Sequence, residues 1–205
     1  FYIKEASNFS KELASKYGNI KTYAGKQADN NAIKMRFSKG LDGYHFAIYE
    51  PGKPSFYVDS YTKDNKKLIA YSKNNLQKKA SDFTCEVLDL GVLKTPSSFE
   101  NKNTNDGLLR TFRLAVVTTS EYSQFQLNRL SIATSAATSV KKEAVLSAIN
   151  TTITRIGGIF ENDLGVKFEL VANNDAIIFL EQEDEVDDSG EGLSNNNPSS
   201  LINAA

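Results

Sequence analysis

The chain has 205 residues, 40% of them hydrophobic and 24% charged, which suits a globular protein with one large domain or two small ones. One histidine and one cysteine are too few for most metal centres, and they exclude an internal disulfide. The net charge of -1 is uneven, because residues 181–191 carry seven acidic side chains, and the mildly basic remainder forms no Arg-rich cluster that would favour a nucleic-acid partner.

The N-terminal residues lack the charged start and apolar stretch of a signal peptide, so we expect the numbering to begin after a removed leader. No run approaches the roughly 20 apolar residues that a membrane-spanning helix needs, and we expect no membrane span. Abundant Asn, Ser, Thr and Tyr favour an exported bacterial protein.

The first half of the chain predicts one short helix and then an antiparallel meander. Residues 7–17 carry Phe9, Leu13 and Tyr17 at four-residue spacing, with a cap before them and Gly18 after them, which predicts a helix. Five short segments rich in Ile, Val, Tyr and Phe then predict strands: residues 20–24, 32–38, 43–49, 55–59 and 67–72.

Apolar residues alternate along two of these strands. They are Ile33, Met35 and Phe37 in one strand, and Tyr44, Phe46 and Ile48 in the next. Because alternate residues share a face of a sheet, we expect this apolar face to lie on a core and the opposite face in water.

Residues 96–106 are polar, rich in turn formers and without apolar periodicity, which predicts an exposed linker suited to proteolytic cutting. After it, residues 110–118 predict a strand whose apolar centre, residues 114–117, is expected to be buried on both faces. Residues 140–162 predict a long helix, and residues 166–171 and 176–180 predict two further strands.

The helix carries a predicted apolar stripe made of Val145, Ile149, Thr152, Ile156 and Ile159. Gly157 and Gly158 interrupt the helix at a cost of about 1 kcal/mol each, so we expect a neighbouring backbone to pack closely there. Five phenylalanines are expected in the core: Phe112, Phe125, Phe160, Phe168 and Phe179. The sequence thus predicts an α+β protein, an antiparallel β-rich unit followed by the strand, helix and strand that begin an α/β domain.

Three blocks of the second half, residues 109–122, 144–156 and 160–175, resemble the opening of the catalytic domain of secreted bacterial reprolysin-like (adamalysin-like) zinc metallopeptidases of the Bacteroidetes type. Residues 20–25, 33–38 and 57–62 resemble the pro-region of the same precursors. The resemblance spans nearly the whole chain. It implies a pro-domain over residues 1–95, a linker over residues 96–106, and the first part of a metzincin-type catalytic domain over residues 107–205.

In that family, two histidines one helical turn apart and a third one hold zinc, and a glutamate polarises the zinc-bound water that attacks the peptide bond. This chain has no such element, so no catalytic residue carries over, and we expect the zinc helix to lie beyond residue 205. The chain would then guard and scaffold a zinc endopeptidase that cleaves peptides or proteins, would be inactive alone, and would bind no cofactor tightly. Its partner would be the remainder of its own catalytic domain.

Two residues remain candidate metal ligands by resemblance. Cys85 stands where related zymogens place an inhibitory thiolate on the zinc ion; the alternatives are a buried structural cysteine beside Phe83 and Val87, or a reactive surface thiol. Glu121 could help to bind calcium, or it could be an ordinary solvated carboxylate.

The remaining features have more ordinary readings. His45 is expected to face outward or to be satisfied in a core rather than to bind a metal. The acidic run at residues 181–191 lacks a calcium-loop pattern, so we expect a solvated tail. A non-catalytic surface or adhesion module, or a pseudoenzyme, is the alternative function.

Overall fold

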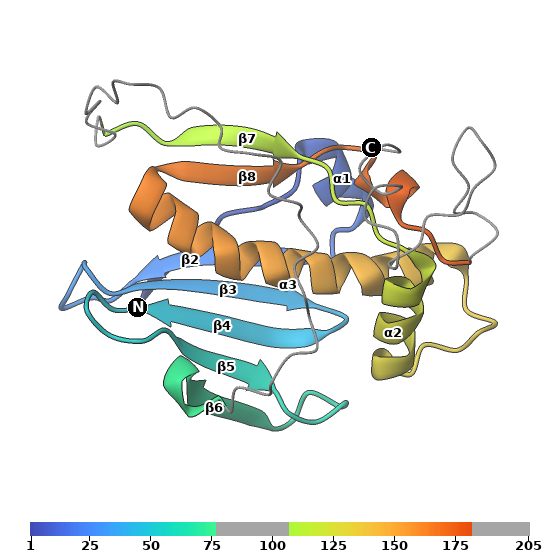
Figure 1. Ribbon diagram of the computed structural model, residues 1–205, viewed down its shortest axis with the longest axis horizontal. Helices are drawn as coiled ribbons and strands as arrows, with labels where there is room; N and C mark the ends of the chain where they lie inside the picture. The colour runs from blue at the N-terminus through green and yellow to red at the C-terminus, as the bar shows by residue number, and fades with distance from the viewer. Residues whose placement is uncertain (77–106, 182–205) are drawn as a thin grey trace, which may run out of the picture.

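Two β-sheets enclose one long helix in the computed structural model, which describes residues 1–76 and 107–181 (Figure 1). The fold is α+β, with a six-stranded antiparallel sheet on one side of helix α3 (Thr138–Leu164) and a two-stranded parallel sheet on the other. Helix α1 (Lys11–Lys16) and helix α2 (Ser120–Leu130) complete the described α-helices, and α2 has no counterpart among the elements expected from the sequence.

The six-stranded sheet is the predicted meander, with strands in chain order. Its members are β1 (Tyr2–Glu5), β2 (Lys21–Lys26), β3 (Lys34–Gly40), β4 (Gly43–Tyr49), β5 (Phe56–Ser60) and β6 (Leu68–Ser72). Five of these strands lie where alternation and turn residues predict them, within one or two residues at most ends. β1 was not expected, and it pairs with the far edge of β2 through the register Tyr2↔Lys26 to Glu5↔Tyr23.

The face of this sheet that packs on α3 is polar, which corrects the sequence expectation. Ser38 of β3 contacts Thr151 of α3, and Thr22 of β2 contacts Asn150. The alternating apolar residues lie on the opposite face, where Phe37 stacks between Tyr23 and Phe46. No described helix packs on that aromatic face.

Helix α3 extends two residues beyond its predicted bounds at each end, and it stops where Gly165 takes a left-handed conformation at φ 63°. Its large buried apolar residues are Val145, Leu146, Ile149 and Ile153, on the side away from the six-stranded sheet. The predicted stripe is wrong beyond Ile149, because Ile156 and Ile159 are exposed. The close neighbour expected at the glycine pair exists at Gly158 alone, and it is a tyrosine side chain rather than a backbone.

The main apolar core lies between α3, α1 and strand β8 (Val166–Leu170), on the upper side of α3 in Figure 1. Phe9, Leu13 and Tyr17 enter it from the N-terminal segment, as their spacing predicts. The helix itself is shorter than expected, because residues 8–10 pair with β8 instead. The backbone N–H of Ser10 donates to the Leu170 carbonyl, and the Leu170 N–H donates to the Asn8 carbonyl. The N-terminal chain therefore extends the second sheet as well as building the first.

The second sheet pairs β7 (Arg110–Leu114) with β8 in parallel, so β7, α3 and β8 form the predicted crossover unit. The strand predicted over residues 110–118 stops early, and residues 114–117 are not buried on both faces, since Ala115 and Val117 are exposed. The cause is Asn174, whose side-chain amide accepts from the Val116 N–H and donates to its carbonyl in place of a strand partner.

The strand predicted at residues 176–180 is also absent as such. A short 3-10 helix, η2 (Asn174–Ile177), takes its place, followed by a single parallel bridge between Thr118 and Ile178.

Three of the five phenylalanines expected in the core are exposed: Phe112 is 52% exposed, Phe125 63% and Phe160 37%. Among the described residues, no helix is long and apolar enough to cross a membrane.

Candidate functional site

The contact between the six-stranded sheet and α3 is a buried layer of hydrogen bonds. Asn150 of α3 is 1% exposed, and its side-chain oxygen accepts from Asn8 at 3.1 Å and from Thr22 at 3.0 Å. The next residue, Thr151, donates to the carboxylate of Asp42 at 2.6 Å. Asn150 Nδ2 and Asp42 Oδ1 are buried without a hydrogen-bond partner among the described residues. Because buried polar groups are costly when they are unpaired, the bonds that do form favour one position of the sheet on the helix.

The only histidine of the chain belongs to this layer. Nδ1 of His45 lies 2.6 Å from a carboxylate oxygen of Asp59, and Nε2 lies 3.0 Å from the backbone oxygen and 3.1 Å from a carboxylate oxygen of Asp42. Arg155 of α3 also pairs with Asp59, and Tyr71 of β6 donates to it. His45 is therefore a satisfied interfacial residue, one of the two readings expected from the sequence.

Both ring nitrogens of His45 face acceptors, so the doubly protonated ring satisfies the site best. Burial by itself lowers the pKa of His45, but the carboxylates of Asp42 and Asp59 outweigh it and raise that pKa to about 9. For Asp59, burial alone raises the pKa, and the hydrogen bonds from His45 and Tyr71 with the charge of Arg155 reverse the shift and lower it. The cluster is a charged clamp between strands β4 to β6 and the helix.

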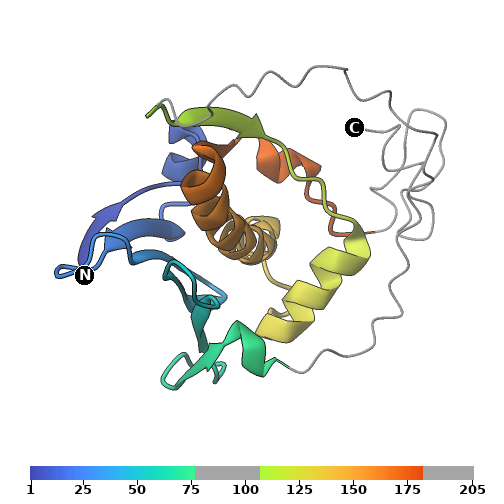
Figure 2. The ribbon, with the colours of Figure 1, turned by 60° about the vertical axis from the view of Figure 1, so that its left-hand side comes forward.

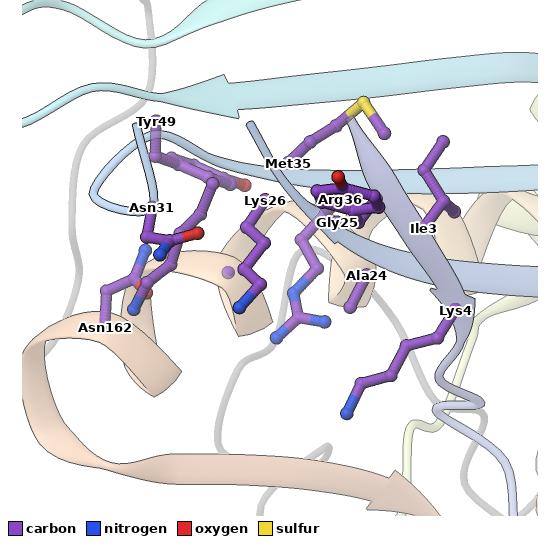
Figure 3. Close-up of a pocket in the computed structure, with 13 residues that line it drawn as sticks. Ile3, Lys4, Ala24, Gly25, Lys26, Asn31, Met35, Arg36, Tyr49 and Asn162 are labelled. Atoms are coloured by element: carbon purple, nitrogen blue, oxygen red, sulfur yellow. The ribbon is translucent and has the colours of Figure 1, made fainter. Parts of the chain in front are cut away.

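A cavity of about 400 Å³ opens beside this layer, between strands β1 to β4 and the C-terminal part of α3 (Figure 3). Four of its lining residues are cations: Lys4, Lys26, Lys34 and Arg36. The side chains of Lys4, Lys26 and Arg36 extend to the same side of the sheet in Figure 3. No carboxylate is among the residues that line it. The lining of the cavity is therefore cationic.

Two of the four cations contact α3. Lys34 donates to the side chain of Asn162 at 2.7 Å, and Arg36 forms an ion pair with Glu161. The side chain of Arg36 is only 15% exposed, and its burial lowers its pKa from the usual value. The side chains of Lys4 and Lys26, which line the same cavity, make no hydrogen bond or ion pair with any described residue.

Sequence reasoning did not single out these cations. A sequence pattern could have indicated them: a lysine or arginine recurs at every second position of a predicted strand, as in Lys34 and Arg36. This spacing places the charges on one face of the sheet. The register then brings distant positions together, because Lys26 lies directly opposite Lys34, and Ala24 lies between Lys4 and Arg36. Pairing across three strands is not visible in any one segment.

Glu121 lies in the first turn of α2 and lines a second cavity of about 540 Å³, together with Glu181 and Asn128. Two carboxylates and an amide are oxygen ligands of the type that calcium takes. Cys85 falls outside the described residues, as does most of the acidic run at residues 181–191.

Within residues 1–76 and 107–181, no three histidine, cysteine, aspartate or glutamate side chains form a group that could hold a metal ion. These residues therefore do not fit the zinc ion that the resemblance implies. Comparison of the chain with protein-family models, with curated proteins and with solved structures found no match.

Proposed function

We propose that the chain is part of the zymogen of a secreted zinc metalloendopeptidase. In this proposal, residues 1–95 are the folding and inhibitory pro-domain, and residues 107–205 are the first part of the catalytic domain. The enzyme class rests on the resemblance of the sequence blocks. The pairing of a folding unit with an unfinished domain rests on the geometry.

One observation carries the proposal. The N-terminal unit does not merely touch the second unit but completes it, because Phe9, Leu13 and Tyr17 fill the same core as Ile149 and Leu170. Residues 8–10 also bond to the edge of β8, which would otherwise expose its backbone groups. An intramolecular chaperone would act in this way, by supplying core and edge contacts to a domain that cannot yet bury its own surface.

The opposite edge of the parallel sheet supports an unfinished domain. Phe112 is on the same face of β7 as Leu114, opposite Phe168 of β8, yet it is 52% exposed, because no described strand continues past β7. Two-stranded parallel sheets are rare alone, and parallel strands are normally covered on both faces. Further strands of the catalytic domain would cover Phe112, and this remainder is the partner that we propose.

The zinc-dependent part of the proposal lies outside the described residues. Zinc would be held by the rest of the precursor, with Cys85 as a proposed inhibitory ligand and Glu121 as a proposed calcium ligand. Peptides or proteins would be the substrates of the mature enzyme. The isolated chain is expected to hydrolyse nothing.

Cutting the chain tests the chaperone role. A specific protease site introduced within residues 96–106 should yield two pieces that co-elute, since the core crosses between them. After separation in denaturant, residues 107–205 should regain helical circular dichroism only when the N-terminal piece is added. A Leu13→Asp piece should fail to rescue, whereas Leu41→Asp, at an exposed turn, should succeed. Independent refolding of residues 107–205 would contradict the role.

The native precursor tests the enzyme class. We expect its reading frame to contain two histidines one helical turn apart with a glutamate between them, and its purified form to show latent, chelator-sensitive proteolysis. Cys85→Ala should raise that latent activity. A precursor that instead continues into repeat modules, or that remains inactive after removal of residues 1–95, would favour the surface-module alternative.

A further inference from the structure

The cavity is lined by more positively charged side chains than its contacts within the protein neutralise. On the helix-facing side of the sheet, Lys26 of β2 stands directly opposite Lys34 of β3. Side chains in such positions have Cβ atoms about 5 Å apart, and like charges placed there destabilise a sheet. Arg36 lies two residues further along β3, on the same face. Three cations therefore crowd one small area of a single sheet face.

The C-terminal end of α3 accounts for only part of this charge. Cations near a helix C-terminus are favourable, and Lys34 and Arg36 do contact Asn162 and Glu161 in the last two turns. Lys4 and Lys26 make no such contact with a described residue. Arg36 also has five N–H donors, and Glu161 is its only described partner. Positively charged side chains with free hydrogen-bond donors thus line a single cavity.

Small residues leave space between these donors. Ala24 separates Lys4 from Arg36 across the three strands, and its methyl group leaves room above the sheet. On the helix side, Gly158 lines the same cavity beside the ring of Tyr49. A volume of about 400 Å³ exceeds that of one inorganic anion and lies in the range of cavities that hold small organic ligands.

We propose that the cavity between β1–β3 and the C-terminal turns of α3 binds a small organic oxyanion ester, a phosphate or a sulfate, with Lys4, Lys26 and Arg36 holding the anionic group. The three cations supply charge-assisted donors to its oxygens. The organic part occupies the space beside Tyr49 and Ala24. A phosphate monoester, which carries two charges at neutral pH, should bind more tightly than a sulfate ester, which carries one. The site does not depend on the proposed peptidase precursor.

Calorimetric titration of the full chain at about 50 mM ionic strength, where exposed charges are only moderately screened, tests the proposal. Phenyl phosphate and phenyl sulfate are the probes, and phenol and inorganic phosphate are the controls. We expect saturable binding of phenyl phosphate with a Kd of about 1 mM or lower, weaker binding of phenyl sulfate, and no binding of phenol.

Single variants locate the site. Lys26→Gln and Lys4→Gln should each weaken binding of phenyl phosphate about tenfold, since each removes one charge-assisted donor. Lys39→Gln is the matched control, because Lys39 lies on β3 but on the opposite face of the sheet, and it should leave Kd within about twofold. Ala24→Leu keeps every charge and fills the hollow, and it too should weaken binding; thermal melting verifies that each variant folds.

Several results would overturn the proposal. Absence of saturable heat with both esters would do so, as would equal losses from Lys39→Gln and Lys26→Gln, which would indicate general charge attraction. Inorganic phosphate that binds as tightly as phenyl phosphate would show that the cavity does not recognise an ester. An unaltered Kd in Ala24→Leu, in a variant that melts normally, would place the anion elsewhere.

Discussion

The phenol ring of Tyr49 lies directly against Gly158 of α3, so that a Cβ atom built at Gly158 would come within 2.5 Å of a ring carbon. The hydroxyl of Tyr49 donates to the backbone oxygen of Arg155 at 2.7 Å, which holds the ring in place. The glycine therefore leaves space on the helix for the ring of a β4 residue. Its neighbour Gly157 has no atom within 4 Å of the same constructed position.

The two adjacent glycines should respond oppositely to alanine. Gly158→Ala must displace the ring of Tyr49 and break its hydrogen bond, and we expect it to lower the free energy of unfolding by about 1–3 kcal/mol. Gly157→Ala adds a methyl group to open space and removes backbone freedom from the unfolded chain, so it should raise that free energy by about 0.5–1 kcal/mol. Urea unfolding of both variants measures the difference. Equal effects of the two substitutions would contradict the close contact.

Stability should fall as pH rises from neutral toward about 9. The folded pKa of His45 is raised to about 9 from 6.5, so the folded state binds the ring proton more tightly than the unfolded state does. The stabilisation is complete below pH 6.5, decreases as pH rises, and is lost above the folded pKa. By linkage its size is about 3 kcal/mol. Urea unfolding at a series of pH values measures it.

His45→Gln is the control for this pH dependence. Glutamine retains hydrogen-bonding groups but has no proton to lose in this range, so the variant should be less stable at pH 6 and should show a flatter dependence between pH 6.5 and 9. Because the chain has one histidine, the difference between the two curves isolates this ring. Parallel curves for the two proteins would mean that folding does not raise the pKa of His45.

The polar layer should also be costly to interrupt at its centre. Asn150→Ala removes the acceptor shared by Asn8 and Thr22, and the freed donor of Thr22 stays buried. We expect a loss of about 2 kcal/mol in the free energy of unfolding. Asn162→Ala, on the same helix, removes only the exposed bond with Lys34 and should cost less than about 0.5 kcal/mol. Equal losses would show that the layer contributes nothing beyond surface hydrogen bonds.

The sequence predicted which residues share a face of the sheet, but not which face the helix covers. Alternation correctly groups Met35 with Phe37, since the period of a strand is two. It carries no information about the partner, and α3 presents Asn150, Thr151 and other small polar residues toward the sheet. A polar helix side selects a polar sheet face, so the usual rule that the apolar face is buried fails here. Only the helix pattern, read together with the strands, could have indicated this.

Non-local pairing explains the other differences. The helix expected over residues 7–17 lacks its first turn because Leu170, far along the chain, offers backbone partners to residues 8–10. Asn174 likewise ends the pairing of β7 through its side chain. The cationic cavity joins Lys4, Lys26 and Arg36 from three strands, and their juxtaposition depends on register. Local propensity predicts elements, and it does not predict the contacts that trim or combine them.

The two units share one apolar core. Leu13 of α1 is fully buried among residues of α3 and β8, so Leu13→Ala should lower the free energy of unfolding by about 2–5 kcal/mol. Because that core joins the two units, amides of β3 and of α3 should lose hydrogen-exchange protection by the same factor. Leu41→Ala, in the exposed turn between β3 and β4, should change neither. If protection fell in α1 alone while α3 kept its full value, the N-terminal unit would be a passive attachment, and its proposed chaperone role would lose its physical basis.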